Sequence, residues 1–208
     1  FFRNWHLPAF GLHAYGAYAP VDRVNLIGTL SWMHNSSDIT QSINAAGFNK
    51  ADADVKTNLF NLGARAEANL PVGKANVIPH AGLRYVWAKS GSYDTKVDGK
   101  KVWGNTPDAT NTFQLPVGVA VRGDIMTVSG WNVRPQADLT FIPQFGDTEQ
   151  KTKLSNFNGV SDKLSGEFAG KFGTSVNLGV QADKGPTTFG VRYGFTAGTK
   201  GKADHAFK

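Results

Sequence analysis

The sequence predicts an all-β protein, an antiparallel up-and-down transmembrane β-barrel, and two observations predict it. Apolar and polar side chains alternate with period two along much of the chain, and that period belongs to a strand whose two faces meet different surroundings. Short and long polar connections also alternate between these stretches. Barrels that cross a membrane show this pattern, because tight turns lie on one side of the membrane and long loops on the other.

The strands are expected where the alternation is clearest. In TTFGVRYGFTAG (187–198), Phe189, Val191 and Tyr193 share one face, whereas Gly190 and Arg192 share the other. The same pattern predicts about eight strands of roughly 10–15 residues and the start of a ninth, out of about twelve in a whole barrel, over 7–19, 24–36, 60–70, 76–89, 113–123, 131–147, 168–182, 187–198 and 204–208.

The connections set the direction of each strand. Short links are expected at 19–23, 71–74 and 183–186, a moderate one at 123–130, and long polar loops at 36–54, 90–111 and 147–166. If the short links are periplasmic, the first strand runs inward. Bacterial barrels have an even number of strands with both termini in the periplasm, so an odd number of strands must precede this one. We therefore expect residues 1–208 to be one barrel domain that is incomplete at both ends.

The alternation does not say which face meets lipid, since a soluble barrel would turn its apolar face inward. Three signals favour the membrane arrangement: glycines interleaved with charges on the polar face, aromatic residues near the strand ends, and strands longer than those of soluble sheets. Four prolines inside the predicted strands count against this register, because proline cannot donate to a sheet: Pro79, Pro116, Pro135 and Pro143.

Two sets of residues follow from this assignment. The expected pore-lining residues are Arg65, Glu67, Arg84, Arg122, Arg134, Asp138, Lys171 and Arg192. The aromatic residues expected at the lipid interface are Tyr18, Tyr85, Trp87, Phe113, Trp131, Phe145, Phe168, Phe189 and Phe195. The charged pore-lining residues have a second reading, in which they pair across strands and stiffen the wall.

Composition excludes several other classes of protein. The chain has no cysteine, which excludes a disulfide framework and thiolate metal sites. A mean hydropathy of −0.29 suits a soluble protein, but alternating strands average their hydropathy away. The net charge of +6 is spread along strands and loops rather than clustered with exposed aromatics, so nucleic-acid binding is not expected.

Three stretches resemble the C-terminal translocator domain of bacterial autotransporters. They are FNLGARAEANLPVGKANVIPHAGLRYVWAKSGSYD, VRPQADLTFIPQFGD and FGVRYGFTAGTKGKADHAFK, and the likeness extends over residues 5–208. The resemblance implies a barrel anchored in the bacterial outer membrane, an N-terminal passenger, and a linker helix through the pore. It also implies contact with outer-membrane lipid and with the barrel-assembly machinery, which reads a terminal aromatic residue. Here the chain stops at Phe207-Lys208.

No catalytic or metal site is expected. His13, His80 and Asp138 lie on different predicted strands without ligand spacing, and the sequence contains neither H-E-x-x-H nor G-x-S-x-G. No cofactor is expected either. The charged stretches 96–101 and 147–153 are interpreted as solvated outer loops, with lipopolysaccharide contact as an alternative. Two other functions stay open: a porin-like or structural barrel without a passenger, and a soluble ligand-binding β-barrel.

Overall fold

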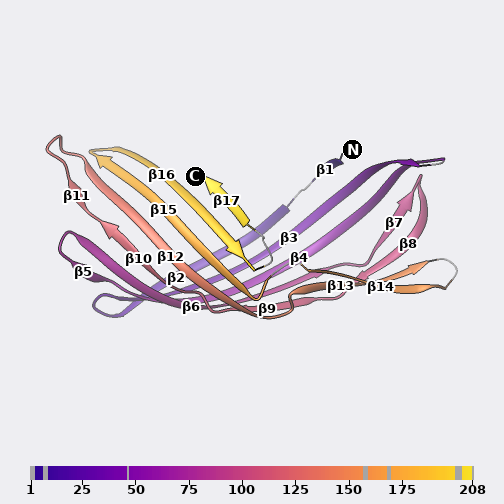
Figure 1. The fold of residues 1–208 in the computed structure, drawn as a ribbon, viewed down its shortest axis with the longest axis horizontal. Helices are drawn as coiled ribbons and strands as arrows, with labels where there is room; N and C mark the ends of the chain where they lie inside the picture. Colours follow the sequence, from indigo (N-terminus) through magenta and orange to yellow (C-terminus); the bar gives the residue numbers. More distant parts are fainter. Residues whose placement is uncertain are drawn as a thin grey trace.

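The computed structural model describes residues 3–6, 9–45, 47–156, 159–167, 170–199 and 203–207, which form one antiparallel sheet of 17 strands (Figure 1). Among these residues, no helix is long and apolar enough to cross a membrane. The strands are β1 (Arg3–His6), β2 (Ala9–Val21), β3 (Val24–Ala45), β4 (Phe48–Ala68), β5 (Leu70–Val72), β6 (Ala75–Ser90), β7 (Tyr93–Val97), β8 (Lys100–Pro107), β9 (Thr110–Gln114), β10 (Val117–Gly123), β11 (Ile125–Met126), β12 (Asn132–Gly146), β13 (Glu149–Asn156), β14 (Ser161–Glu167), β15 (Phe172–Lys184), β16 (Thr187–Gly198) and β17 (Ala203–Phe207).

Short breaks explain why the strands outnumber the prediction. β1 and β2 both pair with β3, and β6 and β7 both pair with β4. Each of these two sets is therefore one long strand with a break, and we call such a strand a pass. Grouped in this way, the passes are β1–β2, β3, β4–β5, β6–β7, β8–β11, β12–β13, β14–β15 and β16, and β17 begins another. The all-β antiparallel fold and its up-and-down order are confirmed.

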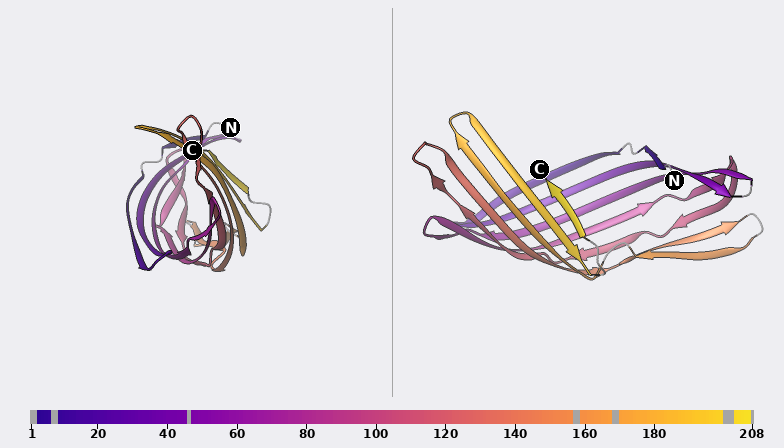
Figure 2. Two further views of the ribbon diagram at one scale, coloured as in Figure 1. Left: turned by 90° about the vertical axis from the view of Figure 1, so that its left-hand side faces the viewer. Right: turned by 45° about the horizontal axis from the view of Figure 1, so that its top comes forward.

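The sheet curls into a rounded trough. Seen end-on, the early strands form one wall and the late strands the other, with both termini near the top (Figure 2). β2 pairs with β3 and β17 pairs with β16. β2 and β17 therefore lie at the two edges of the sheet. The trough thus has a concave inner face and a convex outer face.

Tight turns close the sheet at the end where β5 and β11 lie (Figure 1). The two-residue links at 73–74 and 185–186 begin with Gly73 and Gly185, whose φ angles are +60° and +56°. A type II′ hairpin turn needs a positive φ at its first central residue, which glycine adopts without a steric penalty. The short links predicted from the sequence are confirmed.

The predicted long loops at the opposite end are instead paired strands. Residues 36–54 belong to the hairpin of β3 and β4, which stays paired from Ser36 opposite Lys56 to Ala45 opposite Phe48. Most of 90–111 forms β7 and β8, and most of 147–166 forms β13 and β14. The prediction was wrong because it took polar stretches for loops. Residues 51–56 in fact keep the alternation, with Ala51, Ala53 and Val55 on one face of β4 and charged residues on the other, whereas in β13 both faces are polar and the period-two signal is weak.

The prolines are accommodated in two ways. Pro116 lies in the break between β9 and β10, where its carbonyl accepts a hydrogen bond from the Gly82 amide at 2.8 Å. Pro79, Pro135 and Pro143 stay inside β6 and β12. A proline in a strand loses its own N–H bond only and keeps its carbonyl as an acceptor, which Pro143 uses to accept from the Leu115 amide at 3.0 Å.

Candidate functional site: the polar inner face

The burial of the sheet is inverted relative to a soluble barrel. On the outer face, Leu12 is 74% exposed and Phe189 is 65% exposed. On the inner face, His80 is only 5% exposed and Thr140 only 8%. A soluble sheet buries its apolar face, whereas a membrane barrel turns that face toward lipid and keeps its interior polar.

The inner face encloses a hollow of about 470 Å³. Five of the predicted pore-lining residues line it: Arg65, Arg84, Arg122, Asp138 and Arg192. They come from β4, β6, β10, β12 and β16, which follow one another across the sheet with β15 between the last two. The alternation therefore placed these side chains on one face, and the curl of the sheet brings them around one space.

The other three predicted residues lie outside the lining of this hollow. Glu67 is beside it, where its carboxylate is 3.2 Å from the Arg65 guanidinium. Arg134 lies nearer the tight turns and forms an ion pair with Asp183. Lys171 precedes β15, and its backbone carbonyl accepts a hydrogen bond from the backbone N–H of Gln144 at 2.8 Å.

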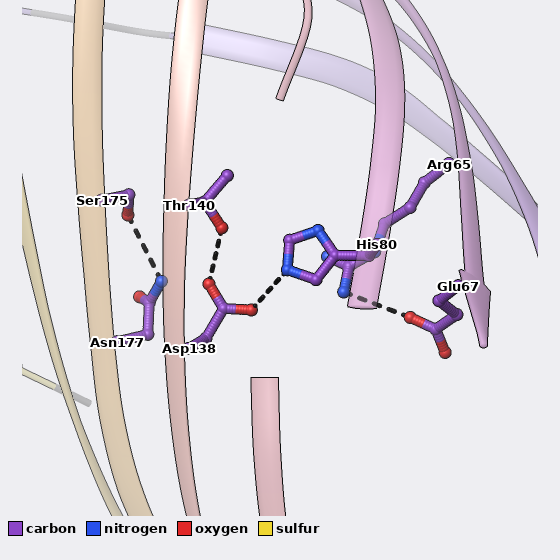
Figure 3. A network of polar contacts seen from close by, with 7 residues as sticks. All are labelled: Arg65, Glu67, His80, Asp138, Thr140, Ser175 and Asn177. Carbon is purple, nitrogen blue, oxygen red and sulfur yellow. Dashed lines mark hydrogen bonds and ion pairs between the residues drawn. The ribbon is translucent and has the colours of Figure 1, made fainter. Parts of the chain in front are cut away.

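A buried polar network crosses the wall (Figure 3). His80 Nε2 on β6 lies 2.9 Å from Asp138 Oδ2 on β12, although β10 runs between these two strands. The Thr140 hydroxyl donates to the other Asp138 oxygen at 2.7 Å. Both carboxylate oxygens therefore have hydrogen-bond partners, and the Asp138 side chain stays 21% exposed.

Gly118 on β10 makes this reach possible. A Cβ built there would lie 2.7 Å from His80 Cε1, 2.8 Å from Thr140 Oγ1 and 2.4 Å from the Leu139 carbonyl oxygen. Any larger residue would compete with the imidazole for the same space. Gly118 is one of the glycines that the sequence interleaves with charges on the polar face, and here the missing side chain leaves room for His80.

A second side chain crosses a glycine in the same way. Arg122, Gln136, Gly179 and Arg192 occupy one row of the ladder across β10, β12, β15 and β16. The Gln136 amide oxygen accepts from the Arg192 guanidinium at 3.0 Å, and a Cβ at Gly179 would lie 2.7 Å from that same end of the Gln136 amide. Gln136 and Gly179 had no place in the predicted site, because only the register shows that they are aligned.

Asp183 is held by donors from two strands. It lies beside the tight turn, one ladder position beyond Phe189. The side-chain amide of Gln181 donates to its carboxylate at 2.9 Å, and the Arg134 guanidinium pairs with the other carboxylate oxygen.

The aromatic residues predicted at the interface form two groups on the outer face, one near β9, before the hairpins of β7–β8 and β13–β14, and one toward the tight turns. Tyr85 faces Phe113 across the ladder with ring centroids 4.8 Å apart, and Phe113 faces Phe145. Toward the tight turns, Trp131 and Phe189 have centroids 6.1 Å apart. The remaining described members of the set are Tyr18, Trp87 and Phe195, and Phe168 lies outside the described residues.

No metal-binding cluster gathers in the part of the chain that the structure describes. Of the three residues weighed as a catalytic or metal group, His80 and Asp138 meet, whereas His13 lies on β2 and stacks on Tyr15. The contact was not predicted, because no local spacing in the sequence signals that residues 58 positions apart will meet.

Comparison with known families agrees with this geometry. Residues 6–194 match the family model described as autotransporter beta-domain. No curated protein shows significant sequence similarity to the chain.

Proposed function

The chain belongs to the autotransporter β-domain family of outer-membrane translocator barrels in type V secretion, and on that premise we propose that it anchors its protein in the outer membrane and provides the route by which an N-terminal passenger reaches the cell surface. The family match over residues 6–194 is the observation that carries this proposal. The family is one of transport rather than of catalysis.

The inverted burial supports the membrane part of the proposal. Large apolar side chains such as Leu12, Leu178 and Val191 are exposed on the outer face, and their transfer from water to lipid is favourable. The inner hollow supports the transport part, since its arginines and amides suit a polar, water-filled lumen. Backbone pairing along each pass satisfies the hydrogen bonds that lipid could not.

The partners follow from this role. We propose that outer-membrane lipid contacts the outer face, that the barrel-assembly machinery inserts the domain, and that further strands of the same protein complete the barrel. The passenger and a linker helix in the lumen would be its own N-terminal segments.

Surface display tests the proposal. The intact protein that carries this domain is expressed in a Gram-negative cell with an epitope in its N-terminal segment, and whole cells are treated with protease. The epitope should be cleaved in intact cells, and Leu178→Arg on the outer face of β15 should abolish that cleavage by preventing insertion. A matched Lys163→Gln variant on β14 should leave cleavage unchanged.

The porin-like alternative gives a different result. An assembled barrel whose N-terminal epitope stays protected in intact cells, and whose vesicles admit small sugars, would contradict a translocator and support a solute pore.

A further inference from the structure

We propose that Arg84, Arg122 and Arg192 form a carboxylate-binding site that holds acidic side chains of the polypeptide occupying the lumen. This inference rests on the proposed function, because it takes a polypeptide to be present there. It adds the chemistry by which the wall recognises that segment.

The first argument is that these three guanidinium groups have no acidic partner among the residues that the structure describes. Arg84 donates to the side-chain oxygen of Gln114 at 3.2 Å, and Arg192 donates to that of Gln136 at 3.0 Å. Arg122 faces Gln136 across the ladder, and no ion pair of the described residues includes it. Neutral amides accept from one N–H group of Arg84 and from two of Arg192, but they do not balance the positive charges.

The second argument is that the nearby acids are already engaged. Asp138 receives its hydrogen bonds from His80 and Thr140, and Glu67 pairs with Arg65 at 3.2 Å. Both carboxylates of this part of the wall therefore serve the wall itself. The hollow as described keeps an excess of positive charge.

The third argument is an unpaired donor in the lining of the hollow. Arg65 Nε is buried and has no acceptor within reach among the described residues. An unpaired buried donor is costly, and an acceptor on an occupant of the lumen would remove that cost.

Carboxylate fits these requirements best. A guanidinium group offers two parallel N–H bonds that match the two oxygens of a carboxylate. The three arginines are exposed on the concave side of the sheet, so their guanidinium groups are accessible to a segment that lies in the hollow. Glutamate or aspartate side chains of an extended or helical segment in the lumen supply such groups.

Channel recordings test the inference in the intact protein, purified in detergent and inserted into a planar bilayer. If the lumen conducts, added decaglutamate should block it, and Arg122→Gln/Arg192→Gln should weaken the block about tenfold or more, because charge-assisted hydrogen bonds are lost. If the protein's own segment already closes the lumen, the same double variant should open it and raise the conductance several-fold.

The matched control is Lys101→Gln/Lys163→Gln, which removes the same number of positive charges from strands beyond the hollow. Block or closure that is equal in both double variants and in the unaltered protein would overturn the inference. Equal block by free glutamate and decaglutamate would assign the site to small anions rather than to a polypeptide. Surface cleavage of the N-terminal epitope by the unaltered protein reports separately on the proposed function.

Discussion

The spanning part of the sheet and the hairpins beyond it are both built of paired antiparallel strands, but they differ in the polarity of their two faces. In β15 and β16, Leu178 and Val191 lie on an apolar outer face, whereas Asn177 and Arg192 lie on a polar inner face. In the hairpin of β13 and β14, the strands are just as regularly paired, but both faces are largely polar. The two regions differ in their surroundings rather than in their secondary structure.

This difference shows what a period-two alternation of apolar and polar residues says about a strand. Alternation does not mark a strand as such; it marks a strand between two unlike media. Where water meets both faces, a strand can carry Lys153 directly opposite Lys163 without a sequence signal of its own. The spanning region should therefore be sensitive to side-chain polarity, and the hairpin beyond it should tolerate change.

The largest expected effect is that of a charge on the outer face of the spanning region. Leu178→Arg should destabilise the inserted barrel by about 2–4 kcal/mol, the range for arginine near the middle of a membrane. Leu164→Arg in β14 should change stability by less than about 0.5 kcal/mol, since Leu164 is already 60% exposed on a polar hairpin. Urea titration of the intact protein in vesicles, followed by heat-modifiable gel mobility, measures both. Equal losses at the two positions would mean that the regions share one environment.

A smaller effect is expected from filling the space beside His80. Gly118→Ala places a methyl group 2.7 Å from His80 Cε1 and 2.4 Å from a backbone oxygen, so the barrel should lose about 1–3 kcal/mol through overpacking. Gly28→Ala on β3 is the control, because a Cβ there meets nothing within 4 Å. The same titration applies, and a neutral Gly118→Ala would show that the reach from His80 to Asp138 is not constrained by this glycine.

The smallest effect is expected in the hairpin. Lys153→Glu replaces a like-charged pair with an opposite pair across from Lys163, and such pairs are worth roughly 0.2–1 kcal/mol. Hydrogen exchange of the β13 and β14 amides should slow by a few-fold while the spanning strands are unaffected. Lys151→Glu, whose ladder partner is Ser165, is the control and should slow exchange less.

The sequence predicted those parts of the structure that local pattern encodes. The fold class, the short turns at Gly73 and Gly185, and the shared face of Arg65, Arg84 and Arg192 all follow from period two and turn chemistry. The length of β3 could not be predicted, because the two faces of its outer half differ little in polarity, whereas the alternation over 51–56 is a signal for the outer half of β4 that the prediction of a loop passed over. The contact of His80 with Asp138 also could not, since it depends on the register of β6, β10 and β12 and on the curl of the sheet.

The most direct test asks which face of one strand meets lipid. The chain has no cysteine, so single cysteines can be introduced along β15 and β16 of the intact protein in vesicles and labelled with a small fluorophore. Labels at Leu178 and Val191 should be quenched by brominated lipid tails, whereas labels at Asn177 and Gly190 should be quenched by a water-soluble quencher. The opposite parity, with Asn177 and Gly190 in lipid, would contradict a polar lumen and an apolar outer face.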